Sequence, residues 1–538
     1  MNALGTLVRF RLRRDRVVGT AWVVVVALSI MFVVSALAST YGTHQMRLGV
    51  IEVLTSNPTL LAVRGAPDGA SAGSFFMTEI GAFMMLLVAF MNTFTAVRHT
   101  RADEEQGRSD LIVATRAGRA SSTWATIVHA GILNVAMGLL SAIVATASGY
   151  DLPGSLVLGW ALASTGIAFF GIGLLSAQIF STSRAANGWG IAAIAVLWVL
   201  NAAADANGTA SADHLHVTPS AAVWFTPVGW GLRIRPYTQN EWWIGLLSLA
   251  LAAVLVAVSF WLQSIRDTSS GLVASRRGRA GASAVLRGPI GLAWRLQRGS
   301  IIGWGIAAVV GGLLIAGLGK TLNDAVAANP EIATSLKKVG SGSGSVLEVF
   351  LGVMAALIGL LVAGAAVQTV IRLRQEEAAT NAETVLATPV GRLRWYLSFV
   401  IVAVVASAII LVLAGAVMGG ALSGIDAKLA GAAIALALAQ LPAVGVYMAV
   451  TAFVFGVFPR ATTAVGWTAF GVGVVLGEFG ALLGLPDWVR QIAPTDHTPT
   501  VPLGSADWGG TWIMAAITIV LVAVGAWAFT RRGLVFTN

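Results

Sequence analysis

The chain has 538 residues, of which 57% are hydrophobic and only 11% are charged, and its formal net charge is +10. This balance lies far outside that of soluble globular domains, so a soluble enzyme or binding module is excluded. The absence of cysteine rules out disulfides, thiolate metal sites and thiol catalysis.

Long apolar windows free of Asp, Glu, Lys and Arg recur from the N-terminus onward. A membrane helix needs about 20 apolar residues to cross the hydrocarbon core, so we predict twelve transmembrane helices in an all-α polytopic membrane protein. The first window is longer than the roughly 7–15-residue core of a cleavable signal peptide, so we expect it to be retained. The windows are 17–46, 80–97, 120–150, 152–183, 185–204, 242–265, 299–319, 349–371, 395–425, 429–459, 461–477 and 508–530.

The basic residues predict the orientation of these spans. With both termini on the cytoplasmic side, 25 of the 34 Lys and Arg residues fall in cytoplasmic segments, as the positive-inside rule requires. The net positive charge is then explained by membrane topology and anionic lipid, and no nucleic-acid partner is needed. We therefore expect a multi-pass protein of the bacterial cell membrane.

A charged motif occurs twice. The stretch 101–119 returns 273 positions later as 374–392, and Arg11–Arg14 before the first span has a counterpart in Arg295–Arg298 before the seventh. Six spans per copy give both copies the same orientation, so the twelve helices form two parallel six-helix repeats. We predict a first half over 1–268, a basic cytoplasmic linker over 269–290 and a second half over 291–538.

The repeated motif predicts one short helix on the cytoplasmic side of each half. In 103–119, three acids occupy the first turn, an apolar run follows, and Arg116 and Arg119 stand at the end, an order that suits the helix dipole. In 376–392, Val385 and Leu386 supply the apolar surface and Pro389 follows. A helix of this kind, parallel to the membrane, suits a groove in a cytoplasmic partner.

The stretches 104–115 and 387–392 resemble the coupling-helix motif of ABC-2-type exporter permeases, and the doubled arrangement resembles fused actinobacterial permeases of the tetronasin-resistance or multidrug-efflux kind. The resemblance implies two helices, 103–119 and 376–392, that contact ATPase subunits. Arg116 replaces the usual proline in the first copy, and 378–380 depart from the motif in the second, so the halves are expected to bind unequally. The implied docking residues are Asp103, Glu104, Glu105, Gly107, Arg108, Asp110, Thr115, Arg119, Glu376, Glu377, Glu383, Thr388, Pro389 and Arg392.

ATP hydrolysis is expected on a separate chain. The nearest approach to a phosphate-binding loop is Gly319-Lys320-Thr321, but Leu314 stands where the first glycine of that motif is required. We therefore expect a transport subunit that is not itself an enzyme and binds no cofactor. ATP and magnesium would lie on the partner, an ABC ATPase present in two copies per permease chain. The expected substrate is a hydrophobic or amphipathic drug or lipid-like compound, moved out of the cell.

Five polar residues in or beside the spans are candidates for the transport pathway: Glu79, Asn92, Glu348, Gln368 and Glu478. The acids raise an alternative, a proton-coupled secondary efflux transporter that uses one of them as a relay. Against these functional interpretations, the acids also suit the headgroup boundary, and the amides suit hydrogen bonding between helices. No metal site is expected, because His214 and His216 have no evident further ligands.

Overall fold

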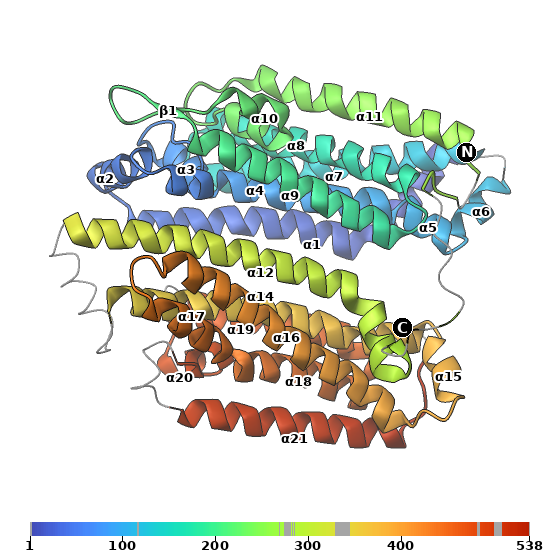
Figure 1. Cartoon of the computed structure of the whole chain (residues 1–538). Coiled ribbons are helices and arrows are strands. Elements are labelled where there is room, and N and C mark those ends of the chain that lie inside the picture. The colour runs from blue at the N-terminus through green and yellow to red at the C-terminus, as the bar shows by residue number, and fades with distance from the viewer. Residues whose placement is uncertain are drawn as a thin grey trace. The chain divides into compact units, whose positions relative to one another are not determined.

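The computed structural model of the chain describes residues 3–115, 118–267, 270–273, 281, 283, 286–328, 345–480, 485–499 and 508–536. These residues form two compact units, Met1–Gly278 and Arg279–Asn538, and almost all regular structure in them is helical (Figure 1). The predicted all-α membrane fold is thereby confirmed. The boundary between the units falls inside the predicted linker 269–290, much of which, including Arg276, Arg277 and Arg279, lies outside the described residues.

The first unit contains six long helices, which match the first six apolar windows. They are α1 (Ala3–Thr40), α4 (Ala72–Arg98), α7 (Gly118–Ala147), α8 (Leu152–Ile179), α9 (Ser183–Ala206) and α11 (Gly245–Ile265). The shorter elements are α2 (His44–Thr55), α3 (Pro58–Arg64), α5 (Arg101–Glu105), α6 (Arg108–Val113), β1 (Thr209–Ala210), β2 (Val217–Thr218), η1 (Ala221–Phe225), α10 (Pro227–Arg233) and η2 (Trp242–Ile244). Strands β1 and β2 pair antiparallel, with Thr209 opposite Thr218.

Short polar side chains cap the start of several long helices, and small residues let them pack. The Asp151 carboxylate accepts from the Gly154 N–H at 2.7 Å and caps α8, and the Thr182 hydroxyl caps α9 through Ala185. Helix α8 packs against α4, α7 and α11, so it is central to the unit. Its contact with α7 requires glycine, because a Cβ on Gly159 would lie 2.3 Å from the Gly138 carbonyl oxygen.

The second unit repeats this pattern of long helices. Its elements are α12 (Pro289–Ala328), α14 (Val346–Ala378), α15 (Asn381–Leu386), α16 (Arg392–Leu422), α17 (Lys428–Leu438), α18 (Leu441–Val457), η4 (Pro459–Ala461), α19 (Thr462–Phe479), α20 (Asp487–Arg490), η5 (Pro494–His497) and α21 (Gly509–Arg531). Helix α12 packs on α16, and α18 packs on α21. Four aromatic side chains, Trp395, Tyr396, Phe455 and Phe529, close the core at the α16, α18 and α21 contact.

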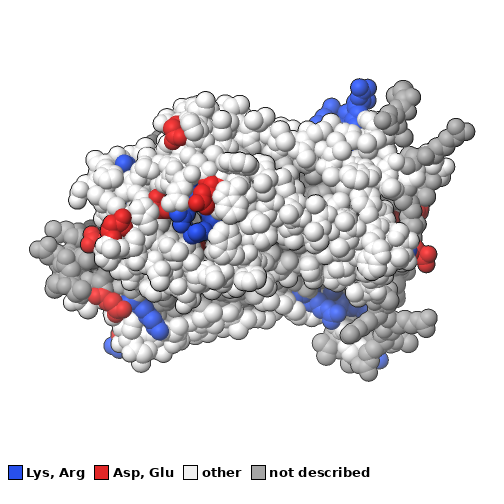
Figure 2. All heavy atoms as spheres, turned by 90° about the horizontal axis from the view of Figure 1, so that it is seen from above, with Lys and Arg blue, Asp and Glu red and all other residues white. Residues whose placement is uncertain are grey.

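Within the described residues, eleven helices are long and apolar enough to cross a membrane. The predicted span over 461–477 corresponds to α19, which has 18 residues and is not among the eleven. At 1.5 Å per residue it is about 27 Å long, slightly less than the hydrocarbon core. The count of twelve therefore stays a prediction. Figure 2 shows one face of the molecule, where a broad uncharged band separates charged side chains gathered toward the ends.

Candidate functional site

The predicted motif helices have different bounds from those expected. In the first unit the acids belong to α5, which begins at Arg101 after a turn at His99 and Thr100, and a separate helix, α6, begins at Arg108. In the second unit α14 runs without a break through Glu376 and Glu377 to Ala378, and α15 follows. The prediction of one helix over 103–119 and one over 376–392 is therefore wrong. Buried arginines neutralise the acids in both copies, and in the second copy the long helix continues through them past its apolar window.

The turn after each of these helices has the same geometry in both units. Gly107 and Thr380, which are 273 positions apart, have φ of +67° and +62° and stand directly before α6 and α15. At the other end, the hydroxyls of Thr115 and Thr388 each donate to the carbonyl three residues earlier at 2.6 Å. The duplicated sequence motif is therefore a duplicated turn–helix–turn structure.

An ion cluster that we name the first clamp consists of Arg101, Glu104 and Arg266. Arg266 follows the last residue of α11, and its guanidinium contacts both oxygens of Glu104 at 2.6 and 3.0 Å. Arg101, fully buried, donates to Glu104 at 2.7 Å and to the Ala177 carbonyl of α8 at 2.8 Å. The first clamp therefore ties the end of α4–α5 to the ends of α8 and α11.

The second clamp consists of Arg374, Glu377 and Arg532. Arg532 follows the last residue of α21 and contacts the two Glu377 oxygens at 2.5 and 3.0 Å. It also donates to the carbonyls of Phe455 and Gly456 at the end of α18, at 3.1 and 3.0 Å. The chain beyond α21 joins the cluster, because the Val535 N–H donates to Glu377 at 3.0 Å. The two clamps therefore use equivalent residues. Each has an Arg-x-x-Glu pair, on α5 in the first unit and at the end of α14 in the second, and an Arg directly after the last long helix of the unit.

The remaining buried acids of the motif fix the neighbouring elements. Asp103 accepts from Arg14 at 2.8 Å and from Arg108 at 3.3 Å, so it joins α1 and α6 to α5. Glu376 forms an ion pair with Arg372 and accepts from Asn381 at 3.1 Å, which holds the start of α15. These acids are satisfied within their own unit and do not present free charge to a partner.

The exposed part of the motif lies on α6, α15 and the turns beside them. Leu111 keeps 75% of its surface exposed, whereas Val385 and Leu386 of α15 pack against the core of the second unit. The two copies therefore present different surfaces. Arg392 is half-buried at the start of α16 and donates to the Arg532 carbonyl; Arg116 and the side chain of Arg119 lie outside the described part. The exposed predicted residues are Glu105, Gly107, Arg108, Asp110, Thr115, Glu383, Thr388 and Pro389.

Four of the five pathway candidates have local partners. Glu79 forms an ion pair with Arg64 at 2.7 Å, and Glu348 completes a capping box with Ser345 at the start of α14. Asn92 and Asn134 exchange two hydrogen bonds, at 3.0 and 2.6 Å, between α4 and α7. Gln368 accepts from the Trp304 indole at 2.5 Å. Glu478 is half-buried near the end of α19.

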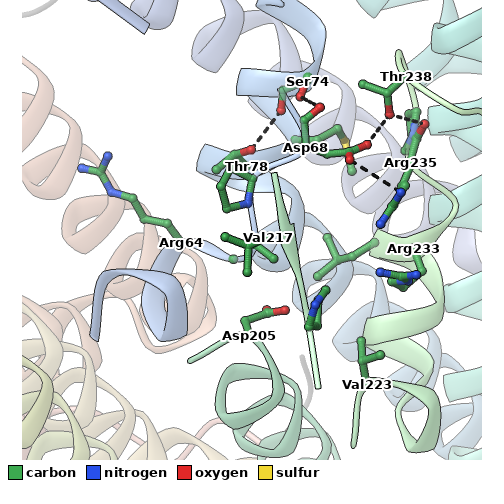
Figure 3. Close-up of a pocket in the computed structure, with 17 residues that line it drawn as sticks. Arg64, Asp68, Ser74, Thr78, Asp205, Val217, Val223, Arg233, Arg235 and Thr238 are labelled. Atoms are coloured by element: carbon green, nitrogen blue, oxygen red, sulfur yellow. Dashed lines mark hydrogen bonds and ion pairs between the residues drawn. The ribbon is translucent and has the colours of Figure 1, made fainter. Parts of the chain in front are cut away.

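A polar pocket lies at the end of the first unit where α3, α4, α9 and α10 meet, far along α4 from the motif (Figure 3). Asp68 contacts Arg235 at 3.7 Å, and the Thr238 hydroxyl donates to it at 2.5 Å. Burial lowers the pKa of Arg233, which lies beside them. The cavity has a volume of about 50 Å³, which suits one or two waters or a small ion and is too small for a drug.

A second cavity, of about 560 Å³, lies among α7, α8 and α11. This volume falls in the range of about 300–1,000 Å³ typical of small-molecule sites. Among the described residues no charged side chain lines it, and three aromatic side chains, Trp124, Phe170 and Phe260, contribute to its wall. The cavity therefore suits an apolar compound or a lipid chain.

Sequence reasoning missed Arg266 and Arg532. A signal was available, because Arg266 directly follows the last apolar window of the first half and the pair Arg531-Arg532 follows that of the second. Their contact with the motif, however, joins residues 162 and 155 positions apart, which the repeat alone did not indicate.

Comparison with known proteins identifies the family. Residues 286–530 match the family described as "Multidrug efflux system permease Rv1217c, C-terminal domain". Over 536 residues, the chain is 33% identical to the "Multidrug efflux system permease protein Rv1217c" of Mycobacterium tuberculosis, covering 98% of this chain and 94% of that protein. The predicted resemblance to an actinobacterial multidrug-efflux permease is thereby confirmed. The chain belongs to the family of multidrug efflux system permeases represented by that mycobacterial protein.

Proposed function

We propose that the chain is the membrane subunit of an ATP-driven exporter, in which two separate ABC ATPase subunits dock on α6 and α15 from the cytoplasm. The observation that carries the proposal is the repeated turn–helix–turn structure, exposed in each unit and anchored by a clamp to the end of a long helix. Family membership supports efflux of a drug, and the apolar cavity supports a hydrophobic or amphipathic substrate. The chain binds no nucleotide itself in this proposal.

The clamps give docking a route to the membrane helices. Displacement of α6 would act on α1 through Asp103, which Arg14 and Arg108 both contact. Displacement of the α5 end would act on α11 through Glu104 and Arg266, and the equivalent movement in the second unit would act on α21 through Glu377 and Arg532. ATP binding shifts such an equilibrium only if it stabilises one arrangement more than the other. Glu104 and Glu377 are therefore transmission residues here, and the exposed residues make the contact.

The test is to reverse the exposed charges while leaving the clamps intact. The chain would be co-expressed with candidate ABC ATPases from the same genome, as wild type and as Glu105→Lys/Asp110→Lys/Glu383→Lys. We expect the variant to reach the membrane at normal levels but to lose ATPase co-purification and ATP-dependent efflux. The matched control is Glu52→Lys, an exposed acid on α2. If the triple variant retains the ATPase as well as the control does, docking on α6 and α15 is wrong.

The proton-coupled alternative is tested in the same cells. It predicts efflux without any ATPase, which an uncoupler abolishes. Two of the acids proposed as proton relays have contacts that favour the ATP-driven mechanism. Arg64 neutralises Glu79, and Glu348 is held in a helix cap. Efflux that persists without ATPase and stops with the proton gradient would overturn our proposal.

A further inference from the structure

A buried cluster in the first unit brings together Asp15 of α1, His99 at the end of α4 and His129 of α7. All three side chains are at most 3% exposed. The Nε2 atoms of both histidines lie 3.2 Å from the same carboxylate oxygen, Oδ2 of Asp15. The ligand atoms all lie within 4.8 Å of one another, so three helices converge on one point.

These separations match the coordination sphere of a transition metal. Zinc binds imidazole nitrogen and carboxylate oxygen at about 2.0–2.2 Å, and a tetrahedron with such bonds has edges of about 3.3–3.5 Å. The two 3.2 Å separations are close to those edges. The third separation, between the two histidine nitrogens, is bounded at 4.8 Å, so an ion between the three atoms would draw the two imidazole rings toward each other.

Both Nε2 atoms are within hydrogen-bond distance of Asp15, and the surroundings orient its carboxylate. Neither Nδ1 atom has a hydrogen-bond partner among the described residues, so the proton can move from Nε2 to Nδ1 when a metal ion replaces the hydrogen bond to Asp15. Arg98 contacts the second oxygen, Oδ1 of Asp15, at 3.0 Å and fixes the carboxylate. Arg11 donates to the His99 carbonyl at 3.0 Å and holds the helix end in place.

Two arginines beside the cluster determine which cations it can bind. Arg98 neutralises part of the Asp15 charge, and Arg11 adds positive charge that Asp103, at 3.6 Å, offsets only in part. Mg²⁺ and Ca²⁺ depend on several anionic or neutral oxygens and are therefore disfavoured. A metal with high affinity for imidazole is favoured, because most of its binding energy comes from the two nitrogens.

The cluster belongs to the first half alone. With the repeat aligned as 101 to 374 and 11 to 295, the equivalent positions hold Gly299, Arg372 and Val402. Helices α12, α14 and α16 pack in the second unit without this cluster. The fold therefore does not require the three residues.

We propose that Asp15, His99 and His129 bind one divalent transition-metal ion, with Zn²⁺ as the best match, and that the ion joins α1, α4 and α7. The proposal stands independently of ATPase docking. Because neither histidine has an Nδ1 partner in the part of the chain that the structure describes, affinity is expected to be about 10–100-fold below that of sites with such partners.

The test uses the full chain purified in detergent with a tag that contains no histidine, stripped with a chelator and titrated with Co²⁺ and then Zn²⁺. We expect one Co²⁺ per chain with visible d–d absorption, displacement by Zn²⁺, and a higher Tm in the presence of Zn²⁺. His99→Gln and His129→Gln should abolish all three signals, because Gln keeps a hydrogen-bond donor for Asp15 but removes the imidazole. The matched control is His214→Gln/His216→Gln, which removes the histidine pair beside Asp213.

Stoichiometric binding that survives in the loop variant and disappears in His129→Gln supports the site. Binding that is equal in His129→Gln and wild type, or that disappears in the loop variant, overturns it. The wild-type titration is decisive even if a variant fails to fold, because a stripped chain that takes up no Co²⁺ or Zn²⁺ has no such site.

Discussion

Glu377 has no exposed surface and binds two guanidinium groups and one backbone N–H. A buried carboxylate of this kind is stable only while its partners remain, because an unpaired charge in a low-dielectric interior is strongly destabilising. The same reasoning applies to Glu104, whose side chain remains 11% exposed. At this scale Glu104 and Glu377 are structural parts of the clamps.

Glu377→Gln should reduce the free energy of unfolding by about 3–5 kcal/mol, because Arg374 and Arg532 lose their counter-charge. The measurement is thermal or denaturant unfolding of the purified chain in detergent. Glu383→Gln is the control, since Glu383 is exposed and surface changes usually stay within about 0.5 kcal/mol. Equal effects of the two substitutions would show that the second clamp does not stabilise the fold.

A second close glycine contact in the first unit lies at the asparagine pair. Gly166 of α8 faces Asn92 of α4 and Asn134 of α7, and a Cβ there would lie 2.3 Å from Asn134 Oδ1 and 2.5 Å from Asn92 Nδ2. Glycine permits the three helices to approach while the amides stay paired. The two hydrogen bonds that Asn92 exchanges with Asn134 join α4 to α7, so the packing of these helices accounts for this buried amide.

Gly166→Ala should destabilise the first unit by about 1–3 kcal/mol, because the added methyl group forces the helices or amides apart. Gly188→Ala in α9 is the control, since its Cβ would meet nothing within 4 Å. There the change should be neutral or stabilising by up to about 1 kcal/mol. Unfolding midpoints of both variants give the comparison, and a Gly166→Ala midpoint at or above that of wild type would contradict the close contact.

The whole molecule has a helical membrane architecture, and its orientation remains a prediction from the distribution of basic residues. The chain contains no cysteine, so single cysteines report their own location without a background. Glu52 of α2 and Glu383 of α15 are both exposed. They are predicted to lie on opposite sides of the membrane.

In intact cells, a membrane-impermeant maleimide should label Glu52→Cys and should leave Glu383→Cys unlabelled until the membrane is opened. The physical basis is the excess of arginine on the predicted cytoplasmic side. The reverse labelling pattern would place α15 outside and would also exclude a cytoplasmic ATPase as its partner.

The sequence alone determined the helical membrane fold, the approximate limits of most long helices and the duplicated motif. These features are local, because apolar length and charge along a single segment decide whether it crosses a bilayer. The motif also predicted Glu105 and Glu383 as docking residues. The structure shows both exposed, and their docking role stays a prediction. The second-copy residues Val385 and Leu386, expected to face a partner, pack against their own unit.

Only the tertiary structure decided which charges are buried and what they contact. Arg266 reaches Glu104 across 162 positions, Arg532 reaches Glu377 across 155, and Asp15 meets His129 across 114. The burial of a carboxylate and the identity of its counter-charge depend on how separate helices pack, and no local pattern specifies that packing. For this reason the motif acids were predicted as a docking surface, whereas the structure places four of them among arginines of their own unit.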